Sequence, residues 1–158
     1  MWYVHFSASW FICDELERLG QELTRDNMRM LADGLRKEHG PSYIVDQLYK
    51  QAAILWKNAI IESIRCVGEV QKLRQYPDFF LLWVDADKKI RYDRIVKRWL
   101  VKDDVTYDQF VEQENKEIHT QNPYEMNLVG CLELADIIIC NDGTPEQLYL
   151  EVERALAI

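Results

Sequence analysis

Three arginines recur at helical spacing in one short basic segment. Arg91, Arg94 and Arg98 follow one another at intervals of three and four residues, which places their guanidinium groups on one face of a helix. A guanidinium group stays charged at every physiological pH and can donate two parallel hydrogen bonds to phosphate oxygens. The segment therefore predicts a binding face for a polyphosphate or for a phosphoryl group in transfer. An ordinary solvated helix face fits the same spacing, so spacing alone leaves both interpretations open.

Polar side chains directly follow three apolar runs. They are Glu62 and Arg65, then Asp85 and Asp87, then Asn141 and Asp142. Ligands of open α/β sheets bind outside the carboxyl ends of the strands, so these groups can converge on one cleft. They also fit strands that simply end where the chain meets water. The histidines lack the spacing of metal ligands or of a nucleophilic triad, and no metal site is predicted.

The elements that position these groups alternate between two patterns. Runs in which odd and even positions are both apolar suit strands buried on both faces of a parallel sheet. Such runs are residues 2–6, 59–61 with an extension to 64, 79–84 and 137–139. Apolar residues at helical spacing occupy residues 12–23, 28–35, 44–55, 70–73, 95–99 and 148–156. This alternation predicts a layered α/β fold with right-handed crossovers.

Turn residues mark two helix boundaries. Gly40 is expected to end one helix and Pro41 to start the next, because glycine adopts positive φ and proline suits a first helical turn. Thr144 is the expected N-cap of the last helix, with Pro145 at its first position. The stretch 102–127 is the most polar, and we expect a lid or an insertion at about 98–127. Residues 1–158 are expected to form a single domain.

Composition restricts the partners. The 158 residues carry 19 Lys and Arg against 27 Asp and Glu, a net charge of −8, which argues against broad attraction to nucleic acid or to an anionic membrane. Any anionic ligand must then be held by a local cluster of basic side chains. The four cysteines form no CxxC pair, so neither a zinc site nor a disulfide framework is indicated. With no long apolar run and no leader pattern, we expect a soluble, cytoplasmic protein.

Several motifs together point to one family. They are Phe6-Ser7 before an amphipathic helix, Arg25-Asp26-Asn27-Met28, His39-Gly40-Pro41-Ser42-Tyr43, Ile60-Ile61-Glu62-Ser63-Ile64-Arg65, Val84-Asp85-Ala86-Asp87 with the arginines after it, and Ala135-Asp136-Ile137 with Asn141-Asp142-Gly143-Thr144. In their order and spacing, residues from about 6 to 158 resemble the P-loop nucleoside and nucleotide kinases. The dephospho-CoA-kinase-like and adenylate-kinase-like members are the most similar.

The resemblance implies a three-layer fold in which helices flank a parallel sheet. It also implies ATP with Mg²⁺ as cofactor and phosphoryl transfer to a nucleotide or to a dephospho-CoA-like acceptor. By resemblance, four residues bind the acceptor: Ser7, Arg25, Glu62 and Arg65. Arg94 and Arg98 are the expected catalytic residues, bordering the lid and facing the donor phosphates. Arg94 also belongs to the expected donor site, together with Asn141, Gly143 and Thr144 near the adenine.

One departure from the family is large. Family members open with a strand, the loop GxxxxGK[ST] and a helix, ahead of the segment that resembles residues 2–7. The sequence contains no GxxxxGK[ST]. The missing strand is expected between the strands near Ile61 and Leu82, so its loss would leave a hole in the core or force those two strands to pair.

Three hypotheses follow. The chain is a nucleotide kinase whose sequence begins too late and which is inactive by itself. Alternatively, it is a non-catalytic relative that binds a nucleotide or phosphate through Arg65, Arg94 and Arg98. In the third, it is an interaction module that pairs exposed sheet edges with another copy or another chain.

Overall fold

The computed structural model describes residues 3–55, 58–98, 105–118 and 120–156. In these residues helices alternate with short parallel strands, which confirms an α/β fold. The order along the chain is β1 (Tyr3–Ser7), α1 (Ala8–Arg18), α2 (Arg25–His39), α3 (Tyr43–Ile54), β2 (Asn58–Glu62), α4 (Val67–Leu73), β3 (Leu82–Asp85), α5 (Lys88–Arg98), α6 (Tyr107–Ile118), α7 (Leu128–Glu133), β4 (Ile137–Cys140) and α8 (Pro145–Leu156).

All four predicted strands form, but β3 starts later than predicted. The Phe79 amide donates to the Tyr76 carbonyl at 3.2 Å in a turn, and the Leu81 amide donates to the Asp136 carboxylate at 2.7 Å. These bonds occupy the backbone amides of Phe79 and Leu81, which therefore cannot donate to a neighbouring strand. The strand therefore begins at Leu82. The apolar run at 79–84 covers both the strand and the loop that leads into it.

The helix end at Gly40 and the N-cap at Thr144 are confirmed, but the expected helix start at Pro41 is wrong. Helix α3 begins at Tyr43 with Ser42 as its N-cap, so Pro41 lies in the turn before it. Gly40 has φ +107° directly after α2, and Thr144 precedes α8, which starts at Pro145. The apolar stripe at residues 12–23 is not one helix, because α1 ends at Arg18 and Gly20 takes φ +66°. Leu23 reaches the core from the following loop instead. The predicted lid region contains α6, and Trp99 lies outside the described residues.

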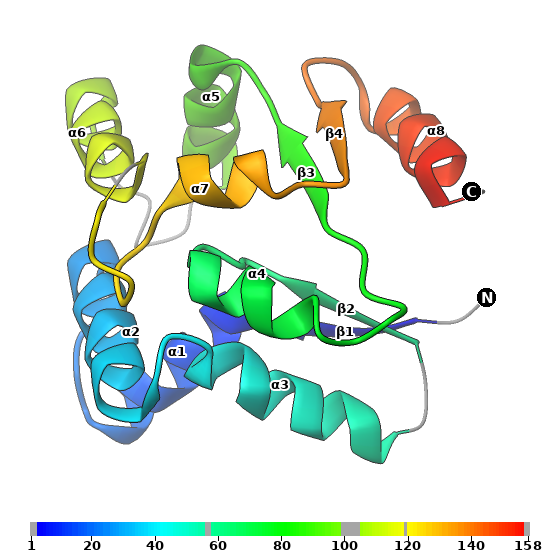
Figure 1. Cartoon of the computed structure of the whole chain (residues 1–158). Coiled ribbons are helices and arrows are strands. Elements are labelled where there is room, and N and C mark those ends of the chain that lie inside the picture. The colour runs from blue at the N-terminus through cyan, green and yellow to red at the C-terminus, as the bar shows by residue number, and fades with distance from the viewer. Residues whose placement is uncertain (1–2, 56–57, 99–104, 119, 157–158) are drawn as a thin grey trace.

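The strands form two parallel pairs instead of the predicted single three-layer sheet. β1 pairs with β2 from Tyr3 and Asn58 onward, and β3 pairs with β4 from Leu82 and Ile137 onward. Figure 1 shows β1 and β2 with α1 to α4 in one half and β3 and β4 with α5, α7 and α8 in the other. Direct pairing of β2 with β3 was one of the two outcomes expected if the family's first strand is missing. In the described part of the chain, β2 and β3 do not pair.

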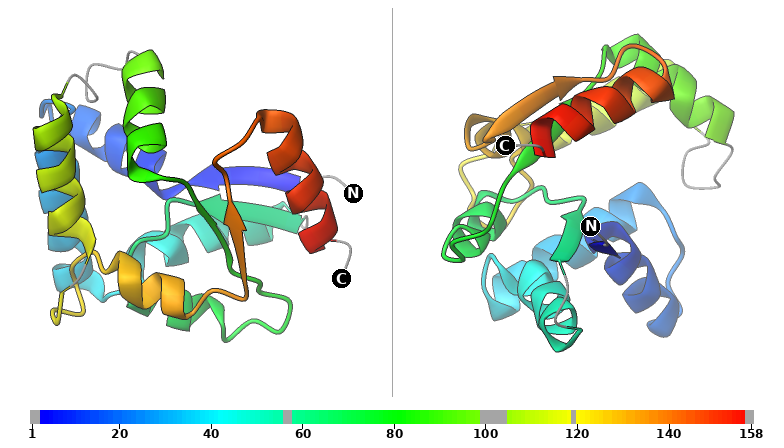
Figure 2. Two further views of the ribbon diagram at one scale, coloured as in Figure 1. Left: turned by 90° about the horizontal axis from the view of Figure 1, so that it is seen from above. Right: turned by 90° about the vertical axis from the view of Figure 1, so that its right-hand side faces the viewer.

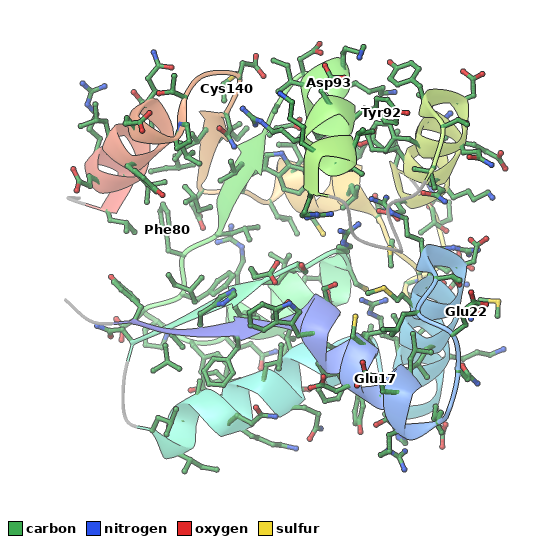
Figure 3. The ribbon with its side chains drawn as sticks, turned by 180° about the vertical axis from the view of Figure 1, so that it is seen from behind. Glu17, Glu22, Phe80, Tyr92, Asp93 and Cys140 are labelled. Carbon is green, nitrogen blue, oxygen red and sulfur yellow. The ribbon has the colours of Figure 1, made fainter. Side chains whose placement is uncertain are left out.

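Separation of the strand pairs leaves apolar side chains in contact with solvent. Ile60 on β2 is 48% exposed and Ile138 on β4 is 61% exposed, although runs of this composition are normally buried on both faces. The views in Figure 2 show the same two halves from above and from the side. Phe80, which is 42% exposed, projects into the space between them (Figure 3).

The hydrophobic core consists of two clusters, and the second spans both halves. One cluster of buried residues packs α1, α2 and α3 together: Ala8, Ile12, Leu16, Ala32, Ile44 and Leu48. A smaller cluster joins α4 and α7 to the start of β3 through Val70, Cys131 and Leu81. Within the described residues, no helix is long and apolar enough to cross a membrane.

Candidate functional site

The carboxyl end of the β1–β2 pair brings two predicted acceptor-site residues together. Ser7 and Glu62 are register partners at the last position of the two strands. The Ser7 hydroxyl is buried and accepts a hydrogen bond from the Trp10 amide at 3.1 Å, so it caps α1. Glu62 accepts a hydrogen bond from the Ser63 hydroxyl. Ser7 therefore fixes the start of α1, while Glu62 lies at the strand end.

A strained residue directs the chain from β2 toward Arg65. Ser63 has φ +64°, a left-handed conformation that costs free energy in residues other than glycine and clusters at functional sites. Beyond it, the Arg65 amide donates to the Glu69 carboxylate at 3.1 Å, and the Arg65 carbonyl accepts from the Asn127 amide at 2.8 Å. The backbone of Arg65 is thus held on both sides, and its guanidinium group binds the carboxylate of Glu117 on α6.

Arg91 lies on α5, directly after β3, and makes a bidentate ion pair. Its Nε and Nη2 atoms donate to the two carboxylate oxygens of Glu114 on α6, at 2.9 and 2.8 Å. Its Nη1 atom donates to the Asp85 carboxylate at 2.5 Å. Hydrogen bonding by Glu114 holds the pKa of Arg91 above its usual value. Arg91 therefore joins the end of β3 to α6.

Arg94 holds the loop between β4 and α8. Its Nη1 and Nη2 atoms donate to the carbonyl oxygens of Asn141, at 2.6 Å, and Gly143, at 3.1 Å. The structure thus brings together three residues of the predicted donor site. The fourth, Thr144, accepts from the Gln147 amide at 3.4 Å and caps α8.

The three arginines of α5 do not form one binding face. Arg91 reaches α6, Arg94 reaches the β4–α8 loop, and Arg98 ends α5 with its side chain exposed. Arg25, the remaining predicted residue, begins α2 directly after its N-cap Thr24. The structure therefore forms two local groups, one around Arg65 and Arg91 and one around Arg94.

Two glutamates of α6, missed from the sequence, connect the strand pairs. Glu117 binds Arg65 at the end of β2, and Glu114 binds Arg91 beyond β3. We call these two glutamates the α6 acid pair. Their side chains are 12% and 16% exposed. The expected lid at 98–127 was the sequence signal nearest to them. Arg65 and Glu117 are 52 residues apart, and a contact over such a distance leaves no local pattern in the sequence.

A buried ion pair between Arg36 and Glu69 holds the backbone of this site in place. Arg36 on α2 is 2% exposed and Glu69 on α4 is 0% exposed. The Nε and Nη2 atoms of Arg36 donate to one carboxylate oxygen of Glu69 at 3.0 and 2.9 Å. The other oxygen accepts from the amides of Arg65 and Cys66 at 3.1 Å each. Glu69 thus ties α2 to the segment that carries Arg65.

Stability should fall with rising pH because of Asp33, one turn before Arg36. Burial raises the pKa of this carboxyl to about 6, against opposing effects of Arg36 and Arg29. Its stabilising contribution is present below its ordinary value of about 3.9 and lost as pH rises through 6. We expect Asp33→Asn to gain stability over the parent between pH 4.5 and pH 7 in urea unfolding.

A matched variant isolates that effect. Asp26→Asn removes one charge from the same helix at a side chain that is 60% exposed, so it corrects for the loss of a negative charge. If the parent loses more stability than Asp33→Asn when the pH is lowered from 7 to 4.5, the assignment of the raised pKa to Asp33 is contradicted.

The residues at the strand ends do not fit a magnesium site for ATP. Asp85 accepts from Arg91, Asp87 accepts from the Lys89 amide at 2.8 Å at the start of α5, and Asp142 accepts from the Asp87 amide at 2.6 Å. At least one oxygen of each carboxylate is thus bonded within the fold. No cluster of three or more His, Cys, Asp or Glu side chains with metal-binding geometry occurs in the described ranges.

Comparison with known proteins shows distant relatives in archaea. The chain is similar to UPF0200 proteins. One from Staphylothermus marinus is 27% identical over 135 residues, which span 85% of this chain and 68% of the relative. One from Pyrobaculum aerophilum is 28% identical over 156 residues, 98% of this chain and 83% of the relative. Another, from Methanococcus vannielii, is 28% identical over 131 residues, 81% and 68% of the two chains.

These names state no substrate and no reaction. No protein-family model matches the chain. The function of the site therefore has to be argued from its own geometry.

Proposed function

We propose that this chain is a nucleotide-kinase-like protein that binds the phosphate end of a nucleotide or of a dephospho-CoA-like acceptor. The observation that carries the proposal is the position of its arginines. Arg65 follows β2 and Arg91 follows β3, the ends at which α/β proteins bind ligands. Each guanidinium already holds a carboxylate, so each is oriented to bind an anion.

The proposal separates binding from catalysis. By resemblance, Arg65 holds the acceptor, while Arg94 and Arg98 stabilise the transferred phosphoryl group. This sequence has no GxxxxGK[ST] loop, whose backbone amides and lysine bind donor phosphates. We therefore expect the chain to bind without turnover, because phosphoryl transfer needs the donor-phosphate contacts that such a loop makes.

Replacing Arg65 by alanine tests the binding role. Loss of a charged hydrogen-bond donor costs about 1.5–3 kcal/mol, so we expect affinity for ADP and for inorganic pyrophosphate to fall about 10-fold to 100-fold. Isothermal titration calorimetry on the 158-residue chain measures this. Arg154→Ala on α8 is the matched control, because Arg154 is 74% exposed and forms an ion pair with Glu151 of its own helix at 2.8 Å.

Two results would reject the proposal. One is a parent chain that binds neither ligand at millimolar concentration, whether or not the α6 acid pair has been neutralised. The other is equal binding by the Arg65→Ala and Arg154→Ala variants.

A second candidate function is association through the strand pairs. The exposure of Ile60 and Ile138 on neighbouring halves favours it, because unpaired apolar strands invite pairing with another chain or copy. Sedimentation velocity distinguishes the two functions. Dimers that form with rising concentration, in a chain that does not respond to pyrophosphate, would support this candidate over phosphate binding.

A further inference from the structure

We propose that the α6 acid pair, Glu114 and Glu117, occupies the positions that two phosphate groups of a polyphosphate ligand take on Arg91 and Arg65. In this state α6 blocks the site, and a polyphosphate opens it by displacing the two carboxylates. The inference rests on the proposed function, because it names the ligand class and the regulation of the same arginines.

The first argument is the geometry of the contacts. Glu114 and Glu117 are three residues apart on α6, so they lie on one helix face. Through that single face, they meet arginines from the two separate halves of the molecule. A guanidinium fork offers the same donors to a carboxylate as to a phosphate. The acid pair therefore marks two neighbouring anion positions, which a ligand with several phosphates can fill together.

The second argument is access. Arg65 and Arg91 have side chains that are 38% and 32% exposed, whereas the glutamates that cover them are 12% and 16% exposed. Lys88 adds further positive charge, with its Nζ atom 4.0 Å from Glu114. An incoming anion can thus reach the basic groups from solvent before either carboxylate leaves. A polyphosphate carries more charge than the two glutamates that it replaces.

The third argument is where α6 is anchored. Phe110, near the start of the helix, is 1% exposed and packs against Tyr92 of α5, with 5.6 Å between ring centroids. Figure 3 shows Tyr92 between α5 and α6. The acid pair lies one to two turns further along α6, beyond this aromatic contact. The carboxylates can therefore move away from the arginines while the apolar anchor stays packed.

The fourth argument is an unsatisfied polar group. The Oε1 atom of Gln113, next to Glu114, is buried and has no hydrogen-bond partner in the described structure. Burying an acceptor without a partner costs free energy. Displacement of this part of α6 that brings the Oε1 atom into contact with water would remove this cost.

Neutralising the acid pair should tighten ligand binding. A ligand that must first displace a resident group binds with an apparent affinity reduced by the fraction of sites that are free. We expect the double variant Glu114→Gln with Glu117→Gln to bind inorganic pyrophosphate at least about 10-fold more tightly than the parent. Glutamine keeps the size of each side chain and removes its charge. Calorimetry on the whole chain measures the affinity.

The control is matched in charge. Glu112→Gln with Glu151→Gln also removes two negative charges, from side chains that are 68% and 50% exposed and that form ion pairs with Lys116 and Arg154. We expect this pair to change pyrophosphate affinity less than about 2-fold, since exposed charges are screened by salt. The difference between the two double variants therefore isolates the acid pair from the general effect of net charge.

The results separate the inference from the proposed function. If the parent binds pyrophosphate and Arg65→Ala loses it, but the acid-pair variant binds no more tightly than the charge control, the inference is overturned and phosphate binding stands. Weaker binding with a lower melting temperature in the acid-pair variant would make the two glutamates structural and would also overturn it. If neither the parent nor the acid-pair variant binds, both proposals fail.

Discussion

Replacing Glu69 by alanine is expected to lower the free energy of unfolding by about 3–5 kcal/mol. The change leaves the guanidinium group of Arg36, which is 2% exposed, buried without its main counter-ion. It also removes the acceptor for the backbone amides of Arg65 and Cys66. Urea unfolding followed by circular dichroism measures the loss, which is a large share of the stability of a typical domain.

An exposed carboxylate in an ion pair provides the comparison for Glu69. Glu151→Ala breaks a pair with Arg154 in which the two side chains are 50% and 74% exposed, and such pairs contribute about 0–1 kcal/mol. Equal losses in Glu69→Ala and Glu151→Ala would show that burial of the Arg36–Glu69 pair is not what makes it important.

Replacing Phe110 by alanine is expected to cost about 3–5 kcal/mol of unfolding free energy, because truncating a buried aromatic residue loses transfer free energy and leaves a cavity. Phe110 is 1% exposed and contacts the rings of Tyr92 and Tyr107. Thermal unfolding measures the effect. Tyr149→Ala on α8 serves as control, since Tyr149 is 66% exposed and exposed sites usually change stability by less than about 0.5 kcal/mol.

The same Phe110 variant bears on the anchoring of α6. If Phe110 holds the helix, its loss frees the acid pair as well, and pyrophosphate binding at a temperature where the variant is folded should not weaken. A variant that keeps the stability of the parent would show that α6 is held by its ion pairs instead.

Local chemistry in the sequence predicted the elements better than their arrangement. Gly40 and Thr144 marked helix ends correctly because a positive φ and an N-cap depend on one or two residues. The apolar runs identified all four strands for a similar reason. They could not show that the bonds of Leu81 with Asp136 delay the start of β3, since that contact joins residues 55 positions apart.

The candidate site was predicted in part for the same reason. The sequence indicated Arg65 and the arginines of α5 from their types and spacing, and it placed Arg94 with Asn141 and Gly143 through the family resemblance. It gave no sign that Glu117 would hold Arg65 or that Arg36 would be buried against Glu69, because these pairs depend on how separate helices pack. The roles in catalysis assigned to Arg94 and Arg98 remain predictions.

The divided sheet has a consequence for how the chain folds. Each strand pair joins residues 55 positions apart, Tyr3 with Asn58 and Leu82 with Ile137, so the two loops cost similar closure entropy. Neither loop contains the other, which lets each half gain its ladder without waiting for its neighbour. We expect the halves to behave as foldons, units that open separately in the native state. The α6 ion pairs and the buried cluster of Val70, Leu81 and Cys131 then couple the two folding units. A ligand that replaces the ion pairs weakens this coupling and changes how cooperatively the whole chain unfolds.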